Sequence, residues 1–448
     1  MWWWVAAALA VPNLVVISLD TTRADALSCY GLPPGLRAGP DITPELDSVA
    51  AAGVRFEAAW ASAPSTLSSH ATMFTGLDPH EHGVVRNGFP LPQGIPTLAE
   101  RLHAAGWDTI AVVGGAPLEG AMGLDRGFVV YDDRLPALQG LSYQDRASGV
   151  VDRALLHVER RDPGRALFLF VHAFDPHAPY DPVGPRHWSA PSGGGPLDSA
   201  DAPMAELVAA IEAGRAEPED VAAVVGRYAA EVHAVDAQVG RLLASLQARA
   251  VLDEAIVVVT ADHGEVLAEH PLYAFSHGTD VTAGALRVPL IVRGYGLPVA
   301  AGRVVRSQVG LVGLAPTLEA LLGLTPQLER PGRRFDALVR AGPVWDSDGW
   351  PERPTRSVFL EATRPRSKER TDGWNNLDFH RGVLAGGYAV RAAPVFDEPV
   401  VEGDLPPGIA SLLAGLLQRW DGTAPDARAE PPLAPATERA LRELGYLE

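Results

Sequence analysis

The chain has 448 residues, of which 47% are hydrophobic, and its formal net charge at pH 7 is -18. A chain of this length and composition can bury a large core, so we expect one large domain with an appendage rather than three small domains. The acidic charge excludes nucleic acid as a partner, because a phosphate backbone is bound by a basic surface. Cys29 is the only cysteine, so no intramolecular disulfide can form and the count does not indicate a compartment.

The chain begins with the apolar segment 1–11, MWWWVAAALAV. It is shorter than the roughly 20 residues that a membrane-spanning helix needs, and it lacks basic residues. We interpret it as the remnant of a signal or membrane anchor, which predicts membrane association through the N-terminus. A disordered or packed N-terminus is the equally weighted alternative.

Strand and helix patterns alternate along most of the chain. Apolar runs typical of buried parallel strands are found at 14–19, 54–58, 109–113, 167–171 and 256–260. Helical patterns are found at 43–52, 96–105, 150–160 and 218–248. This alternation predicts a doubly wound α/β fold. The Gly, Pro, Ser and Ala content of 182–217 predicts an exposed insertion that borders the crevice.

The C-terminal part has weaker patterns. Segments 357–362 and 381–394 predict a small antiparallel sheet, and 412–420 and 437–447 predict terminal helices that dock on the body. We therefore divide the chain into the N-terminal remnant 1–11, a main domain 12–345 and a C-terminal subdomain 346–448.

Polar side chains with metal-binding chemistry follow two of the apolar runs. The apolar run in VVISLDTTRAD ends at Asp20, and the run in AIVVVTADHGE ends at Asp262 and His263. A helix is expected to begin at Thr66 in the segment TLSSHATMFTG. Because the carboxyl ends of parallel strands meet in one crevice, we expect these side chains to lie together. Two carboxylates, an imidazole and a hydroxyl suit a divalent cation, which would activate the hydroxyl as a nucleophile. The alternatives are a helix N-cap at Asp20 and an ordinary turn at DHG.

Six segments in one order resemble the sulfatase branch of the alkaline phosphatase superfamily, from about Pro12 to about Leu324. They are PNLVVISLDTTRADALSCYG, the run from Thr66, FLFVHAFDPHAPYDP, TADHGEVLAEH, SHG and LRVPLIVRG. The resemblance implies an α/β/α sandwich with a large, mostly parallel central sheet and a small C-terminal antiparallel subdomain. It implies a hydrolase of sulfuric or phosphoric esters (EC 3.1 type). It also implies a cell-envelope or periplasmic location, or a cytoplasmic one if segment 1–11 is not a signal or anchor remnant.

The chain departs from the sulfatase pattern Cys-x-Pro-Ser-Arg at two positions. When the pattern is aligned by its distance to Thr75-Gly76, Thr66 takes the position of the nucleophilic cysteine and His70 takes that of the arginine. Threonine cannot be converted to formylglycine, so a threonine ester must be released by water, as in the superfamily's phosphodiesterases. This favours phosphate or phosphonate esters. Ser62 is the other candidate, but we reject it because no arginine follows and its spacing is four residues too long.

The resemblance also implies roles for residues farther along the chain. His177 would bind a substrate oxygen or protonate the leaving group, and His277 lies where relatives keep a basic group beside the leaving oxygen. Asn87 would contact the substrate oxyanion. A solvated loop histidine is the alternative for both imidazoles. The predicted catalytic residues are Thr66, His177 and His277, the substrate-binding residues are His70, Asn87 and His177, and the metal ligands are Asp20, Thr66, Asp262 and His263.

The identity and number of metal ions stay open at this point. Thr21 stands where sulfatases carry a second aspartate, and His263 replaces their asparagine, which favours Mn, Zn or Mg over the family's Ca. One ion is the preferred expectation. A second ion held by Asp175, His177 and His277, near His172, is the alternative.

Three further polar residues are assigned structural roles ahead of site roles, namely His82, Glu231 and Asp236. Two other functions stay open beside the hydrolase of an anionic ester. One is a transferase that passes a phospho-group to a glycan or lipid acceptor, and the other is a relative that binds anionic ligands without turnover. The sequence does not indicate the natural substrate or the oligomeric state.

Overall fold

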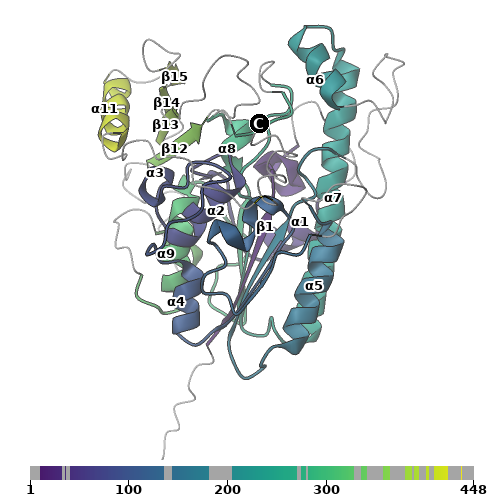
Figure 1. The fold of residues 1–448 in the computed structure, drawn as a ribbon, viewed down its shortest axis with the longest axis vertical. Coiled ribbons are helices and arrows are strands. Elements are labelled where there is room, and N and C mark those ends of the chain that lie inside the picture. Colours follow the sequence, from purple (N-terminus) through teal and green to yellow (C-terminus); the bar gives the residue numbers. More distant parts are fainter. Residues whose placement is uncertain are drawn as a thin grey trace, which may run out of the picture.

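A large central sheet forms the middle layer of this computed structural model (Figure 1). The described residues are 11–32, 36, 41–135, 144–180, 204–269, 274–278, 281–326, 334–340, 357–363, 379–385, 388–392, 400–402, 408–421 and 435. The sheet has eight strands in the order β10-β2-β9-β7-β1-β6-β4-β5. They are β1 (Asn13–Leu19), β2 (Val54–Phe56), β4 (Asp108–Val113), β5 (Val130–Asp132), β6 (Leu167–Ala173), β7 (Ala255–Thr260), β9 (Leu290–Tyr295) and β10 (Arg303–Val305). Strand β9 is antiparallel to both of its neighbours, and the other pairs are parallel.

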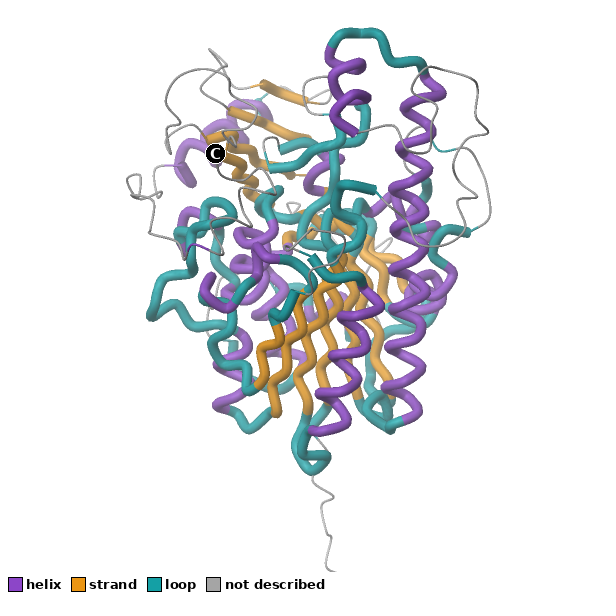
Figure 2. Tube along the Cα trace, turned by 45° about the vertical axis from the view of Figure 1, so that its right-hand side comes forward, coloured by secondary structure: helices purple, strands orange, loops and turns teal. Residues whose placement is uncertain are grey.

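Helices cover both faces of this sheet because its strands are apolar on both faces. Leu14 and Val16 of β1 pack in one cluster, and Val15 and Ile17 pack in another. The first cluster includes residues of α2 (Thr66–Thr75), α4 (Leu98–Ala104) and α9 (Leu314–Leu321). The second includes residues of α1 (Pro44–Ala51), α5 (Ala147–Arg160) and α7 (Pro218–Ala248). The two helical layers are separated by the strands in Figure 2.

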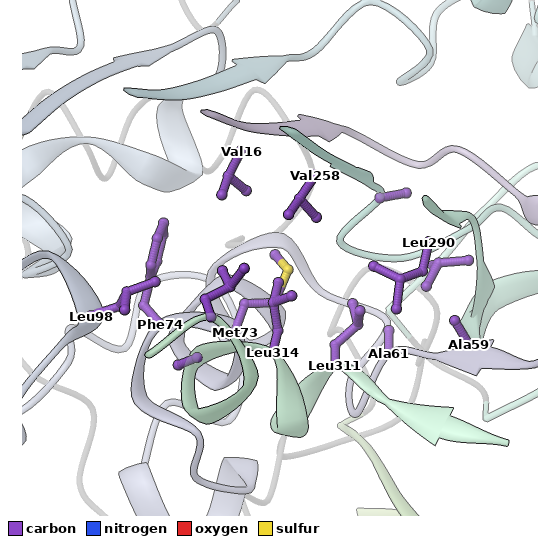
Figure 3. Packing of buried hydrophobic residues seen from close by; sticks show 14 of the residues in the cluster. Val16, Ala59, Ala61, Met73, Phe74, Leu98, Val258, Leu290, Leu311 and Leu314 are labelled. Carbon is purple, nitrogen blue, oxygen red and sulfur yellow. The ribbon is translucent and has the colours of Figure 1, made fainter. Parts of the chain in front are cut away.

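The first cluster fixes the position of α2, the helix that begins at Thr66. Figure 3 shows Val16 and Val258 of the sheet above Met73 of α2 and Leu314 of α9. These side chains are at most 3% exposed, so burial of their apolar surface stabilises the contact between helix and sheet. Gly76 ends α2 in the left-handed conformation at φ 70, which glycine adopts without steric cost.

The predicted α/β/α sandwich and the small C-terminal antiparallel sheet are both confirmed. The C-terminal sheet contains β12 (Val358–Thr363), β13 (Phe379–Ala385), β14 (Tyr388–Ala392) and β15 (Val400–Glu402), and α11 (Ile409–Asp421) packs on it. Trp420 of α11 donates from Nε1 to Oδ2 of Asp78 at 3.2 Å. Its ring also stacks on Phe359, with 5.0 Å between the ring centroids. These contacts join the C-terminal sheet to the main body.

The remaining elements are short. A second, three-stranded sheet contains β3 (Ala59–Trp60), β8 (Arg287–Val288) and β11 (Val309–Gly310). The other helices are α3 (Pro79–His82), α6 (Met204–Glu212), α8 (Ala283–Leu286) and α10 (Asp336–Val339). Short 3-10 helices span Ala24–Ala26, Ser28–Tyr30, Ala116–Leu118, Gly120–Met122 and Leu311–Gly313.

The exposed insertion expected at 182–217 contains a helix, α6, at residues 204–212. Leu207 on α6 is 2% exposed and packs in a cluster with Val224 and Tyr228 of α7. Residues 182–203, the apolar residues 1–10 and the expected helix 437–447 lie outside the described residues. Among the helices that are described, none is both long and apolar enough to cross a membrane.

Candidate active site

The predicted metal ligands come together at the carboxyl ends of two adjacent strands. β1 and β7 are parallel neighbours, and Asp20 follows β1 while Asp262 and His263 follow β7. All three side chains are fully buried. Their ligand atoms lie within 4.8 Å of one another. This is the convergence that a parallel sheet produces at its carboxyl edge.

The polar atoms of this cluster suit a divalent cation. His263 donates from Nδ1 to the carbonyl of Gly264 at 2.9 Å, so Nε2 keeps its lone pair. In the described part of the chain, Oδ1 of Asp20 and Oδ2 of Asp262 have no hydrogen-bond partner. Buried carboxylate oxygens without partners are costly unless a cation or a donor satisfies them. The donor set of two carboxylates and one imidazole therefore fits a bound divalent metal.

The pKa shifts of the two carboxylates also favour a bound cation. Burial and the neighbouring Asp262 raise the pKa of Asp20 well above its usual range. Burial would also raise the pKa of Asp262, but His263 and His70 outweigh it and lower that pKa. Two buried carboxylates that lie close together repel each other, and a cation between the two groups would remove that repulsion.

Thr66 lies against this cluster as the first residue of α2. Its Oγ1 is 3.4 Å from Nε2 of His263, and its side chain is fully buried. The N-terminus of a helix carries a partial positive charge that favours anions. Asn87 fixes this helix start, because its Oδ1 accepts from the backbone N–H of Leu67 at 2.8 Å and from Oγ of Ser65 at 3.1 Å. Nδ2 of Asn87 is buried without a partner among the described residues, so it can donate to a ligand.

His70 lies one helical turn after Thr66, at the position where the sulfatase pattern has an arginine. Its Nδ1 donates to the carbonyl of Thr66 at 2.7 Å, and its Nε2 is 2.9 Å from Oγ of Ser18. Burial lowers the pKa of His70 to about 3, so the ring is neutral. Both of its nitrogens are engaged within the protein, and its substrate-binding role stays a prediction.

His177 and His277 lie beside the cluster. The ring centroid of His277 is 4.5 Å from that of His263 and 4.9 Å from that of His177. His177 stacks on Phe174 at 4.5 Å and donates from Nδ1 to the carbonyl of Ala178 at 2.7 Å. Burial and His277 lower the pKa of His177 to about 3. The two predicted imidazoles therefore border the same site as Thr66.

Asp175, His177 and His277, the residues expected for a second metal site, do not form a metal-ligating group among the described residues, and the second ion stays a prediction. Asp175 accepts from the backbone N–H of Ala147 and faces Arg146 at 3.8 Å, so it caps α5. Among the described residues, the second group with metal-ligating geometry contains His70, His172 and Asp262. It shares Asp262 with the first group and includes neither His177 nor His277.

Two residues near the site were not predicted as site residues. Glu265 is fully buried and accepts from Nδ1 of His277 at 3.1 Å. His172 of β6 donates from Nε2 to Oδ2 of Asp20 at 3.1 Å. The signal for Glu265 is a carboxylate only two residues after His263, a predicted metal ligand. The signal for His172 is a polar residue inside an apolar strand.

The three residues assigned structural roles make structural contacts. Asp236 accepts from the backbone N–H groups of Glu45 and Leu46 at the start of α1, at 3.1 and 2.8 Å. Glu231 faces Arg146 at 3.3 Å. His82 lies 2.9 Å from Thr72 through Nε2 and accepts from the N–H of Val84 at its Nδ1.

The sequence profile of the Sulfatase family matches residues 12–324. The chain belongs to this family. It is a hydrolase of the class that acts on sulfuric and phosphoric esters. It is 24% identical over 366 residues to the uncharacterized sulfatase YidJ of Escherichia coli, covering 73% of this chain and 71% of that protein. It is 25% identical over 379 residues to an arylsulfatase of Clostridium perfringens, covering 68% of this chain and 74% of that protein.

A solved structure shows the same fold. The phosphonate monoester hydrolase of Agrobacterium radiobacter superimposes with a TM-score of 0.68 at 20% sequence identity. The match covers 92% of this chain and 95% of that chain. The structural match thus extends beyond residue 324, where the family profile ends.

Proposed function

We propose that this sulfatase-family protein is a metal-dependent hydrolase of sulfate or phosphonate and phosphate esters in which Thr66 is the nucleophile. The observation that carries the proposal is the position of Thr66 Oγ1, 3.4 Å from Nε2 of His263 and beside two buried carboxylates. The substrate class is supported by relatives, which include an arylsulfatase and a choline-sulfatase. The shared fold with a phosphonate monoester hydrolase extends the class to phosphorus esters.

Asp20, Asp262 and His263 would hold one divalent cation, and Thr66 would complete the ligand set. Mn, Zn or Mg suits the mixture of carboxylate and imidazole. When bound, such a cation supplies positive charge that lowers the pKa of a hydroxyl group and polarises an ester oxygen. Thr66 stands in the position where sulfatases carry the formylglycine precursor.

In the first step, Oγ of Thr66 forms a bond to sulfur or phosphorus while the bond from that atom to the leaving oxygen breaks. The hydroxyl proton of Thr66 passes to solvent, and the leaving oxygen takes a proton held at Nε2 of His277. The free amide of Asn87 donates to a non-bridging oxygen of the substrate. The negative charge of the bound ester raises the pKa of His177, and Nε2 of the protonated ring then donates to another of these oxygens.

In the second step, water attacks the sulfur or phosphorus of the threonine ester, and the bond to Oγ breaks. Oγ takes a proton from the attacking water, solvent returns a proton to Nε2 of His277, and the free acid leaves. A formylglycine hydrate releases its product differently, by collapse to the aldehyde. Threonine has no such route, so hydrolysis at sulfur or phosphorus completes the cycle.

A substrate panel with metal analysis tests this proposal. The panel contains 4-nitrophenyl sulfate, phosphate, phosphodiester and phenylphosphonate, assayed with Mn, Zn or Mg. We expect Thr66→Ala to lower kcat by a factor on the order of 1000 or more, and Thr66→Ser to retain part of the activity. Turnover by Thr66→Ala equal to that of the wild type on the preferred ester would contradict the proposal.

A further inference from the structure

Glu265 is a fully buried carboxylate beside the site, with a donor on each oxygen. Oε1 accepts from Nδ1 of His277 at 3.1 Å, and Oε2 accepts from the hydroxyl of Tyr180 at 3.0 Å. Tyr180 is 3% exposed, and its ring meets those of Tyr228 and Phe275 edge-on at 5.5 and 6.3 Å. The carboxylate is thus held between a packed phenol and an imidazole.

The backbone around Glu265 is fixed as well. Val266 and Ser276 exchange N–H to carbonyl hydrogen bonds at 3.0 and 3.2 Å, so the segments that carry Glu265 and His277 pair as a small hairpin. Arg23 donates from Nη1 to the carbonyl of Glu265 at 3.0 Å. The backbone segments that carry Glu265 and His277 are therefore joined to each other by hydrogen bonds, and Arg23 is bonded to the carbonyl of Glu265.

We propose that Glu265 is a positioning residue that fixes the tautomer and ring orientation of His277, and that Tyr180 holds Glu265 in place. This inference rests on the proposed function, in which His277 protonates the leaving oxygen. A hydrogen bond at one ring nitrogen decides which atom of an imidazole is available for chemistry. The carboxylate of Glu265 accepts from Nδ1–H, so the proton that the imidazolium of His277 transfers is the one at Nε2, and the ring that remains is the neutral Nδ1–H tautomer.

The consequence is a dependence on the leaving group. A weakly basic leaving oxygen, such as that of 4-nitrophenol, departs without a proton, whereas a more basic phenol needs one. A residue that acts by orienting the proton donor should therefore matter more for basic leaving groups. A residue that only supports the fold should affect all esters of one acid alike.

The experiment measures kcat/KM for a series of aryl esters of one acid, namely the acid whose esters the wild type hydrolyses best. The leaving phenol varies from 4-nitrophenol to unsubstituted phenol. Glu265→Met removes both acceptor oxygens at similar volume. We expect it to lower kcat/KM about 10- to 100-fold for the phenyl ester and clearly less for the 4-nitrophenyl ester. Glu265→Gln, which keeps one acceptor oxygen, should restore part of the loss. Tyr180→Phe should act in the same direction with a smaller effect.

Glu269→Gln is the matched control. Glu269 lies four residues farther along, its side chain is 37% exposed, and it pairs with Arg23 instead of His277. Its leaving-group dependence should equal that of the wild type. The metal content of the Glu265 and Tyr180 variants should also equal that of the wild type, because Glu265 is in neither metal-ligating group of the described residues and Tyr180 donates to Glu265.

A double-mutant cycle with His277→Ala decides between positioning and structure. If Glu265 acts through His277, then Glu265→Met does not lower kcat/KM any further when it is added to His277→Ala. An additional loss there, or an equal loss for every ester of the series, would overturn the inference. If Glu265→Met does not fold, Tyr180→Phe takes its place in the cycle.

The outcomes also separate this inference from the proposed function. A wild-type leaving-group dependence in His277→Ala would remove both the proton-donor role of His277 and the role of Glu265, while the role of Thr66 would stand. A steeper dependence in His277→Ala, combined with wild-type behaviour of the Glu265 and Tyr180 variants, would overturn only the inference.

Discussion

His172 and Asp20 face each other across two adjacent strands, with Nε2 of the imidazole 3.1 Å from Oδ2 of the carboxylate. Both side chains are fully buried, and burial lowers the pKa of His172 to about 4, so the ring is a neutral donor. The bond occupies Oδ2 and leaves Oδ1 of Asp20 for another partner. His172 thus orients the carboxylate that we propose as a metal ligand.

Replacement of His172 should weaken metal binding. His172→Phe removes the donor to Asp20 while filling the space, so we expect the affinity for the divalent metal to fall about 10- to 100-fold. His172→Gln, whose amide can reach the same oxygen, should recover part of the affinity. Titration of the metal-free protein, followed by calorimetry and by activity, measures both effects. Equal affinities in all three proteins would show that His172 does not orient Asp20.

Gly264 should not tolerate a side chain. A Cβ at this position would lie 2.1 Å from the carbonyl oxygen of Gly284, so Gly264→Ala must displace the backbone between His263 and Glu265. We expect a loss of metal binding and a lower Tm. Gly415→Ala is the control, because its Cβ would meet only the end of Arg419 at 3.6 Å. That helical change should be neutral or stabilise by about 0.5–1 kcal/mol. Wild-type metal binding by Gly264→Ala would contradict the expectation.

The hydroxyl of Tyr228 supports the segment that follows Asp20. It donates to the carbonyl of Thr21 at 2.9 Å and accepts from the N–H of Arg23 at 3.0 Å, and Thr21 has the uncommon positive φ of 49. We expect Tyr228→Phe to destabilise the protein by about 1–3 kcal/mol, because two buried backbone groups lose their partner. Metal affinity should fall as well.

A second tyrosine provides the control for this prediction. Tyr131 donates its hydroxyl to the carbonyl of Leu118 at 2.6 Å, and neither residue is next in the chain to Asp20, Asp262 or His263. Tyr131→Phe should lower stability in urea unfolding but leave metal affinity unchanged. The expectation fails if the two variants affect metal binding equally.

Asp236 should make stability depend on pH. Burial outweighs the hydrogen bonds from Leu46 and Glu45 and raises the pKa of Asp236 to about 7. The folded state then binds more protons than the unfolded state between about pH 4 and pH 7, so this contribution to stability is present at low pH and is lost as the pH rises through 7. Asp236→Asn removes it. Between about pH 4 and pH 7, the free energy of unfolding of the wild type should fall by roughly 1–3 kcal/mol relative to that of the variant. Urea unfolding measures this difference. A difference in unfolding free energy between the two proteins that does not change with pH would contradict the raised pKa of Asp236.

Much of the fold could be predicted from the sequence because local patterns were strong. The helix 218–248 has the bounds of α7, where Pro218 favours the first turn and apolar residues recur at helical spacing. The strands before Asp20 and Asp262 were found as apolar runs. Helix α6 was missed because it begins in a segment rich in Gly, Pro and Ser, and its burial against α7 could not be known beforehand.

The site could be predicted only in part. Asp20, Asp262, His263 and Thr66 were expected to meet, and the structure places them together. The contact between His172 and Asp20 depends on β6 lying beside β1, which strand patterns do not indicate. The pairing of Glu265 with His277 depends on a hairpin register, and the orientation of His70 toward Ser18 depends on tertiary packing.

The central claim is that Thr66 forms a covalent ester during turnover. Acid quenching of the enzyme with its preferred substrate, followed by peptide mass spectrometry, tests it most directly. We expect one sulfuryl, phosphoryl or phosphonyl group on Thr66 that appears only with substrate and is absent in Thr66→Ala. The same group found on another residue, such as Ser62, or full turnover by Thr66→Ala, would contradict it.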